Sequence, residues 1–220
     1  MSIVKDIYVR PITSKDANAF VVQHHYSKSY VMNSTLHLGC FLNGVLHGVM
    51  QFGNSIDKRN VIGFVDTGLN EKQGWNSFLE LNRLAFDDKL PKNSESRCIA
   101  IAIRILKKKA PHIKWILSYA DGTQCGDGTI YRASGFYLCG INKNNTIYRL
   151  ANGKTKAKHG TSKTDFTNAF KLKGNQLRYI YLIDRSCKIT LPILKYSAID
   201  DNNAGMYLGK PMTLTERKVA

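Results

Sequence analysis

The sequence predicts a mixed α+β fold, with a central twisted mixed sheet that is flanked by helices. Two alternating apolar runs are joined by Asn43-Gly44, a strong short-range signal for a β-hairpin with a type I′ turn. Residues 78–142 then read as a strand, a polar turn, an apolar helix, a strand, a short helix and a strand. With 220 residues, of which 43% are hydrophobic, the chain can bury a substantial core.

The first third of the chain predicts a strand, a helix and the hairpin. Ser14 is a residue type that caps helices, and apolar residues recur at helical spacing after it. The predicted elements are a strand over 6–12, a helix over about 15–25, hairpin strands over 36–42 and 45–53, and an irregular stretch over 54–74.

The central part predicts a strand over 78–86 and a buried helix that ends at Lys109. Asn93 or Ser94 can cap this helix, and three lysines at its carboxyl end suit the helix dipole. The alternation in the apolar run also allows a strand, but the cap and the terminal charges favour a helix. On the strand, Glu80 and Asn82 are two apart and should share a face, so Arg83 should point to the other face.

The remaining residues predict more β structure and a basic extension. Further strands are expected over 114–122 and 137–142, then over 146–150 paired with the strand before it, and over 177–184 and 189–196; the tail after Ser197 is expected to be coil. We expect a core over 1–150 and a basic, β-rich carboxy-terminal extension over 151–220 that packs on or continues the same domain.

The chain is strongly basic. It holds 32 Lys and Arg against 16 Asp and Glu, which gives a net charge of +16. Such a surplus favours a polyanionic partner, although a basic surface that binds nothing is the alternative. The stretch 153–163 is basic and poor in apolar residues, so it is predicted to lie along a phosphate backbone. The residues predicted to contact DNA are Lys154, Lys156, Lys158 and Lys163.

The cysteine pattern and the apolar segments predict the cellular compartment of the protein. The five cysteines are odd in number and form no closely spaced pair, which favours free thiols and argues against structural zinc. We expect no signal peptide and no membrane span, and therefore a cytoplasmic protein.

The polar turn before the buried helix predicts an anion site. The first-turn amides of a helix lack partners inside the helix, and its dipole favours negative charge there. This turn could therefore hold the pyrophosphate of a nucleotide cofactor, with helix capping as a compatible alternative role for its serines. The residues predicted to bind the cofactor at this turn are Asn93, Ser94, Ser96 and Arg97.

The order of these elements resembles the GNAT acyltransferase fold over about residues 6–150. The turn over 91–97 stands where that family binds pyrophosphate, although it lacks the family's glycines. The string Ile130 to Phe136, which contains Tyr131, resembles the motif that follows. The resemblance implies that the fourth and fifth strands of the sheet splay apart and that an acyl-CoA lies between them. It also implies that Arg83 and Tyr131 contact the cofactor.

A closer resemblance is to the phage Mom family. It is carried by the strings His25-Tyr26-Ser27, Glu80 to Leu84, Ser118 to Asp121 and Gly128 to Tyr131. The resemblance implies a GNAT-like enzyme that converts adenine in DNA to N6-carbamoylmethyladenine and so protects the DNA from restriction. It further implies an acyl-CoA or related donor, iron held by a His and an Asp, and a location in the host cytoplasm.

Four side chains are the candidate catalytic residues: His25, Tyr26, Asp121 and Tyr131. His25 could act as a base or could bind iron with Asp121, and Tyr26 could stack on a base. Tyr131 is the candidate proton donor. The alternatives are that His25 and Tyr26 are surface residues, that Asp121 belongs to an Asp-Gly turn, and that Tyr131 packs between helix and sheet.

The predicted partner is double-stranded DNA with the adenine flipped out of the helix, and the protein itself could be a homodimer. An acyl thioester would give an amide, whereas carbamoylmethyladenine has an alkyl linkage, so plain acyl transfer cannot be the whole reaction. Two other classes stay open. One is a GNAT N-acyltransferase that acts on a protein or small-molecule amine, and the other is a DNA-binding protein without catalytic activity.

Overall fold

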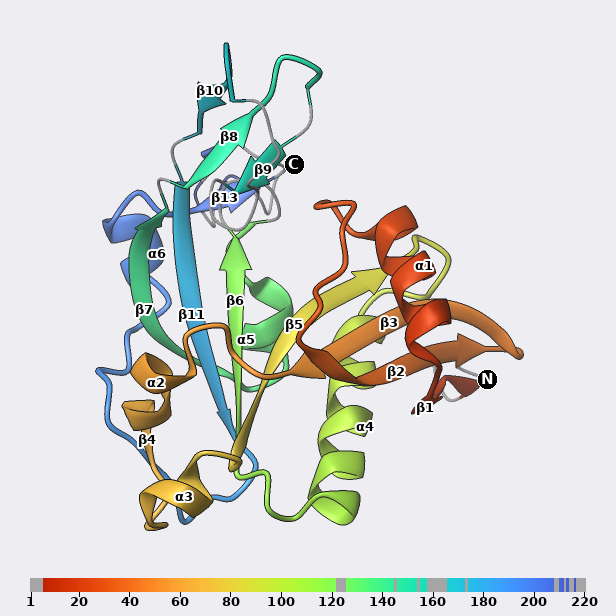
Figure 1. Ribbon diagram of the computed structural model, residues 1–220, viewed down its shortest axis with the longest axis vertical. Helices are drawn as coiled ribbons and strands as arrows, with labels where there is room; N and C mark the ends of the chain where they lie inside the picture. Colours follow the sequence, from red (N-terminus) through yellow and green to blue (C-terminus); the bar gives the residue numbers. More distant parts are fainter. Residues whose placement is uncertain are drawn as a thin grey trace.

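Seven strands form one mixed sheet, in the order β1-β2-β3-β5-β6-β11-β7 (Figure 1). The computed structural model describes residues 6–121, 126–144, 146–153, 155–157, 166–172, 174–207, 210–211, 213 and 216. The strands of this sheet are β1 (Tyr8–Pro11), β2 (Ser34–Leu42), β3 (Val45–Gly53), β5 (Phe78–Phe86), β6 (Trp115–Asp121), β11 (Gly174–Leu182) and β7 (Tyr137–Asn144). Among the described strands of this sheet, only β5 and β6 pair in parallel. The predicted mixed α+β fold is confirmed.

Helices cover both faces of this sheet. On one face α1 (Ser14–His24) packs through Phe20 and Val21 against Val49 and Ala85. On the other face α4 (Ser94–Lys109) buries its apolar stripe, and α5 (Thr129–Ala133) lies beside it. Figure 1 shows α1 and α4 on opposite sides of the strands. The remaining helices are short: α2 (Lys58–Val61), η2 (Ile62–Phe64), α3 (Glu71–Gly74) and α6 (Ala198–Asp201).

The hairpin between β2 and β3 forms as predicted. Asn43 and Gly44 have φ values of 52° and 81°, the pair of positive values that a type I′ turn requires. The predicted cap of α1 is wrong by one residue. Thr13, in extended backbone, accepts a hydrogen bond from the Asp16 amide at 3.1 Å, so Ser14 is already helical.

The strands β5 and β6 form a fork. They pair only where Phe78–Glu80 meets Trp115–Leu117, and beyond that point no pairing joins them among the described residues. Figure 1 shows the two strands diverging toward their carboxyl ends. The predicted splay is therefore confirmed.

The carboxy-terminal part adds a strand to the main sheet and corrects a predicted strand pairing. Strand β11 lies between β6 and β7, within the main sheet. The predicted pairing of 146–150 with the strand before it is wrong, because Asn144 closes a turn onto Thr146 and β8 (Ile147–Arg149) pairs instead with two other strands. These two strands are β9 (Thr155–Ala157) and β10 (Phe170–Lys171).

The expected strand over 189–196 shrinks to β12 (Lys188–Ile189), which pairs with β4 (Val65–Asp66). Pro192 lies in this stretch and cannot donate to a ladder. The expected coil after Ser197 is also wrong, since it contains α6, β13 (Met206–Tyr207) and β14 (Lys210–Pro211). Ile199 and Ala204 anchor this tail in the main core. Within the described ranges, no helix has the length and apolar character needed to cross a membrane.

Candidate functional site

A β-bulge in the fork places Glu80 and Arg83 on one face of β5. Across β3, Gln51 lies opposite Arg83, Phe52 opposite Leu81, and Gly53 opposite Glu80, so Asn82 is the extra residue. Residues 51 and 53 of β3 share a face, and their partners point to that same side. The expectation that Arg83 and Glu80 face opposite ways is therefore wrong. The bulge turns both side chains toward the face that carries α1.

Arg83 is the centre of the candidate site. Its Nε donates to the Ser29 carbonyl at 3.0 Å, which ties the loop after α1 to the fork. The Glu80 carboxyl and the hydroxyls of Tyr26 and Tyr131 lie within electrostatic range of its guanidinium. Since α5 packs on the opposite face of the sheet from α1, the groups that act on Arg83 come from both faces of the sheet.

His25 is held as a neutral imidazole. Its Nδ1 accepts the Ser27 amide N–H at 3.1 Å and lies 2.8 Å from the Ser27 hydroxyl, which leaves the proton on Nε2. Burial, followed by the positive charges of Arg83 and Lys28, lowers the pKa of His25 to about 3. At neutral pH His25 therefore offers an N–H donor at Nε2.

The two candidate tyrosines have different surroundings. Tyr26 is 39% exposed, and its ring lies 4.1 Å from that of His25. Tyr131 is buried, with its ring 5.3 Å from Tyr179 and 5.5 Å from Phe136. Tyr26 thus offers an open face for stacking, whereas Tyr131 combines packing against the core with a hydroxyl near Arg83.

Glu80 adds a carboxyl to this cluster. Ser55 and Asn82 lie within hydrogen-bonding reach of its carboxyl, and Ser34 donates to the Asn82 side-chain oxygen at 3.1 Å. Burial raises the pKa of Glu80, although these contacts and Arg83 act in the opposite direction. Sequence reasoning did not assign Glu80 a role. The signal available to it was a run of polar residues on an otherwise apolar strand, where polar groups need partners or a cleft.

The turn before α4 uses its serines to shape the backbone. Asn93 adopts a left-handed conformation with φ 70°. Ser94 is fully buried, and its hydroxyl donates to the Pro91 carbonyl, while the Ser96 hydroxyl donates to the Asn93 carbonyl at 3.1 Å. Arg97 has a buried Nε without a hydrogen-bond partner in the described part of the chain. The Ser94 and Arg97 amides donate to the Pro91 and Asn93 carbonyls, so what remains for an anion at this turn is the amides of Glu95 and Ser96 and the side chain of Arg97.

The residues predicted to hold iron are His25 and Asp121. Asp121 ends β6, where it pairs with Gln176 of β11. Among the described residues, no group of three or more His, Cys, Asp or Glu side chains could hold a metal ion. The engagement of His25 Nδ1 by the Ser27 amide also leaves Nε2 protonated, so the described residues do not fit an iron site.

The predicted DNA-contacting lysines are only partly placed. Lys156 is exposed on β9, whereas Lys154, Lys158 and Lys163 lie outside the described residues. Strand β8 follows the end of β7, and β10 precedes the start of β11, at the sheet edge where β6 ends. The small basic sheet therefore lies at the open end of the fork.

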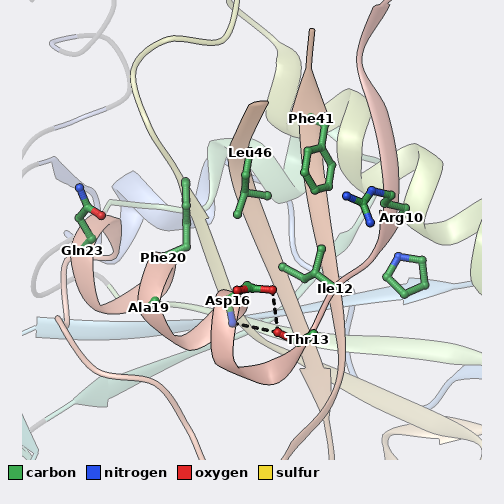
Figure 2. A pocket seen from close by; sticks show the side chains of 10 residues that line it. Arg10, Ile12, Thr13, Asp16, Ala19, Phe20, Gln23, Phe41 and Leu46 are labelled. Carbon is green, nitrogen blue, oxygen red and sulfur yellow. Dashed lines mark hydrogen bonds between the residues drawn. The ribbon is translucent and has the colours of Figure 1, made fainter. Parts of the chain in front are cut away.

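A separate hollow of about 660 Å³ lies beside α1, away from the fork. Figure 2 shows Arg10, Asp16, Phe20, Phe41 and Leu46 around it. None of the predicted site residues lines this hollow. The candidate catalytic side chains lie instead around Arg83, where β5 and β6 diverge.

Comparisons with known proteins agree with the resemblance stated above. The model of the Mom protein family matches residues 6–198. The methylcarbamoylase mom of Escherichia phage Mu is 35% identical over 150 residues, which make up 66% of this chain and 58% of that relative. The chain thus spans little more than half the length of this curated relative.

Solved structures with similarity to the chain include acetyltransferases. The IAA acetyltransferase from Bacillus cereus is 11% identical, with a TM-score of 0.47, over 80% of this chain and 99% of that chain. The spermidine/spermine N-acetyltransferase from Vibrio cholerae is 9% identical, also with a TM-score of 0.47, over 83% and 95%.

Proposed function

This chain belongs to the Mom protein family, and we propose that it is a transferase that converts adenine in DNA to N6-carbamoylmethyladenine. The observation that carries the proposal is the cluster of Tyr26, Glu80 and Tyr131 around Arg83, where β5 and β6 diverge. The phage Mu relative is named a methylcarbamoylase, which supports the same reaction.

The exocyclic N6 of adenine is a poor nucleophile, because its lone pair is delocalised into the ring. In the reaction, N6 forms a bond to the methylene carbon of the carbamoylmethyl group, the bond from that carbon to the rest of the donor breaks with its electron pair leaving on the donor remnant, and N6 loses one proton. We assign acceptance of that proton to Glu80, whose carboxyl stands on the α1 face of the fork. His25, as a neutral donor at Nε2, and the exposed ring of Tyr26 would orient the base.

On the opposite face, the first turn of α4 would hold the phosphates of an acyl-CoA or related donor. Backbone amides there and the side chain of Arg97 provide the positive potential. Arg83 and Tyr131 would direct hydrogen bonds to the reacting end of the donor where β5 and β6 diverge. Because the product has an alkyl linkage, the donor must present a methylene carbon to N6.

DNA is the proposed partner. A net charge of +16 suits a polyanion, and Lys156 lies on a small sheet at the open end of the fork. Adenine N6 is inaccessible to a buried site while the base is stacked, so the base would leave the duplex at a cost of a few kcal/mol.

Mass spectrometry of nucleosides tests this proposal. DNA is isolated from cells that express the chain, digested and searched for carbamoylmethyladenine. We expect the modified nucleoside with the wild type and with His24→Ala, whose ring packs on Phe20 at 4.3 Å. His25→Ala should abolish it. Unmodified DNA together with acetyl-CoA turnover on a protein or small amine would instead select the acyltransferase reading, and DNA affinity without any product would select a non-catalytic protein.

A further inference from the structure

Two large apolar side chains stand out on the surface of the described part of the chain. Ile56 is 91% exposed and Met32 is 88% exposed, whereas the next most exposed, Phe170, reaches 70%. Exposed apolar residues are common one at a time, so each alone would need no explanation. Met32 and Ile56 come from two different loops, however, and the loops are joined.

A pair of asparagines clamps these loops together. The Asn54 amide donates to the Asn33 carbonyl at 3.2 Å, and the Asn33 side-chain amide donates to the Asn54 carbonyl. Gly53 permits this approach, because a Cβ at that position would lie 2.0 Å from the Asn33 carbonyl oxygen. Met32 adjoins one side of the clamp, and Ile56 lies two residues beyond the other. The two exposed apolar side chains therefore flank the clamp in the sequence, and the two clamped loops, residues 25–33 and 54–56, form one ridge.

The ridge borders the candidate site. Its first loop begins at His25 and Tyr26, and its Ser29 carbonyl accepts from Arg83. Its second loop carries Ser55, which lies against Glu80. Both loops thus contact side chains of β5 on the face of the sheet that carries α1.

We propose that Met32 and Ile56 form an apolar wedge that enters the base stack of a DNA duplex beside the target adenine. This inference rests on the proposed function. Extruding a base leaves a gap in the stack, and apolar side chains inserted between base steps are known to unstack and kink a duplex. The basic charge of the chain favours a duplex partner, and the wedge would stand next to the side chains that receive the extruded base.

The test compares one DNA sequence in two forms, a single-stranded circle and its double-stranded form. Extract from cells that express either the wild type or a variant supplies both the enzyme and the donor. Modified adenine in each DNA form is counted by mass spectrometry. The double variant Met32→Gln with Ile56→Asn is compared with the wild type. Ile193→Asn, which changes another exposed isoleucine (57% exposed), serves as the matched control.

The ratio of duplex to single-strand modification should fall about tenfold or more in the double variant, because only the duplex requires extrusion. The control should keep the wild-type ratio. An unchanged ratio in the double variant, or equal losses on both DNA forms, would overturn the wedge. A wild type that modifies neither DNA form would instead refute the proposed function itself.

Discussion

At the scale of single residues, the charge state of His25 is set by its surroundings. The Ser27 amide engages Nδ1, and burial together with Arg83 and Lys28 opposes protonation. Sequence reasoning assigned His25 to the site. It could not foresee that the imidazole is neutral, because Arg83 is distant along the chain. The same holds for Glu80, whose orientation depends on a bulge. The neutral state of His25 has a measurable consequence for stability.

The free energy of unfolding should fall as the pH drops below 6.5. The folded pKa of His25, about 3, lies below its ordinary value of 6.5, so the unfolded chain binds a proton that the folded chain refuses. The loss begins near pH 6.5, continues toward pH 3, and amounts to at most about 1.4 kcal/mol per pH unit. Denaturant unfolding of wild type and His25→Asn between pH 7 and pH 4 checks it. Equal pH slopes in the two proteins would contradict the assignment.

Glu80→Gln should separate chemistry from structure. Glutamine keeps the size of the side chain and can still hydrogen-bond to Ser55 and Asn82, so the free energy of unfolding should change by about 1 kcal/mol or less. Loss of the proton acceptor should lower adenine modification on the order of 100-fold. Nucleoside counts alongside thermal melting measure both effects. Modification at the wild-type level would remove Glu80 from the reaction.

At the scale of elements, locally encoded features were predictable and features that depend on distant pairing were not. Asn43 and Gly44 favour the positive φ values of their turn. The charges that stabilise the ends of α4 belong to its own residues, so the sequence of the helix alone predicts it. The bulge at Asn82 exists only in register with β3, and β11 inserts between β6 and β7, which lie far from it in sequence. The predicted residues His25, Tyr26 and Tyr131 gather around Arg83.

The clamp between the two loops predicts a cost for Gly53→Ala. The added methyl would meet the Asn33 backbone at 2.0 Å, so the loops must separate, and the protein should lose about 1–3 kcal/mol of stability. Gly63→Ala is the control, since a Cβ there meets nothing within 4 Å. Chemical denaturation of both variants measures the difference. Equal stabilities would show that the loops are not held as described.

At the scale of the whole molecule, the net charge of +16 bears on the DNA partner that we propose. If the four predicted lysines neutralise four phosphates, the logarithm of the association constant should fall with the logarithm of salt concentration at a slope of about −3.6. Lys156→Ala should reduce the slope by about 0.9. Lys107→Ala, at the far end of α4, should leave it unchanged. Fluorescence anisotropy across a salt series measures the slope, and a flat response would rule out a phosphate-tracking surface.

The most direct test of the fork as the reaction site is Arg83→Lys. Lysine keeps the positive charge but cannot reproduce the planar group of donors that bonds to the Ser29 and Asn82 carbonyls beside Tyr26 and Tyr131. Carbamoylmethyladenine is counted in DNA from cells that express wild type or variant, with both proteins shown to be folded by circular dichroism. We predict the modified base with the wild type and a folded variant that leaves DNA unmodified. Equal modification by the two proteins would show that Arg83 and the fork are not the reaction site.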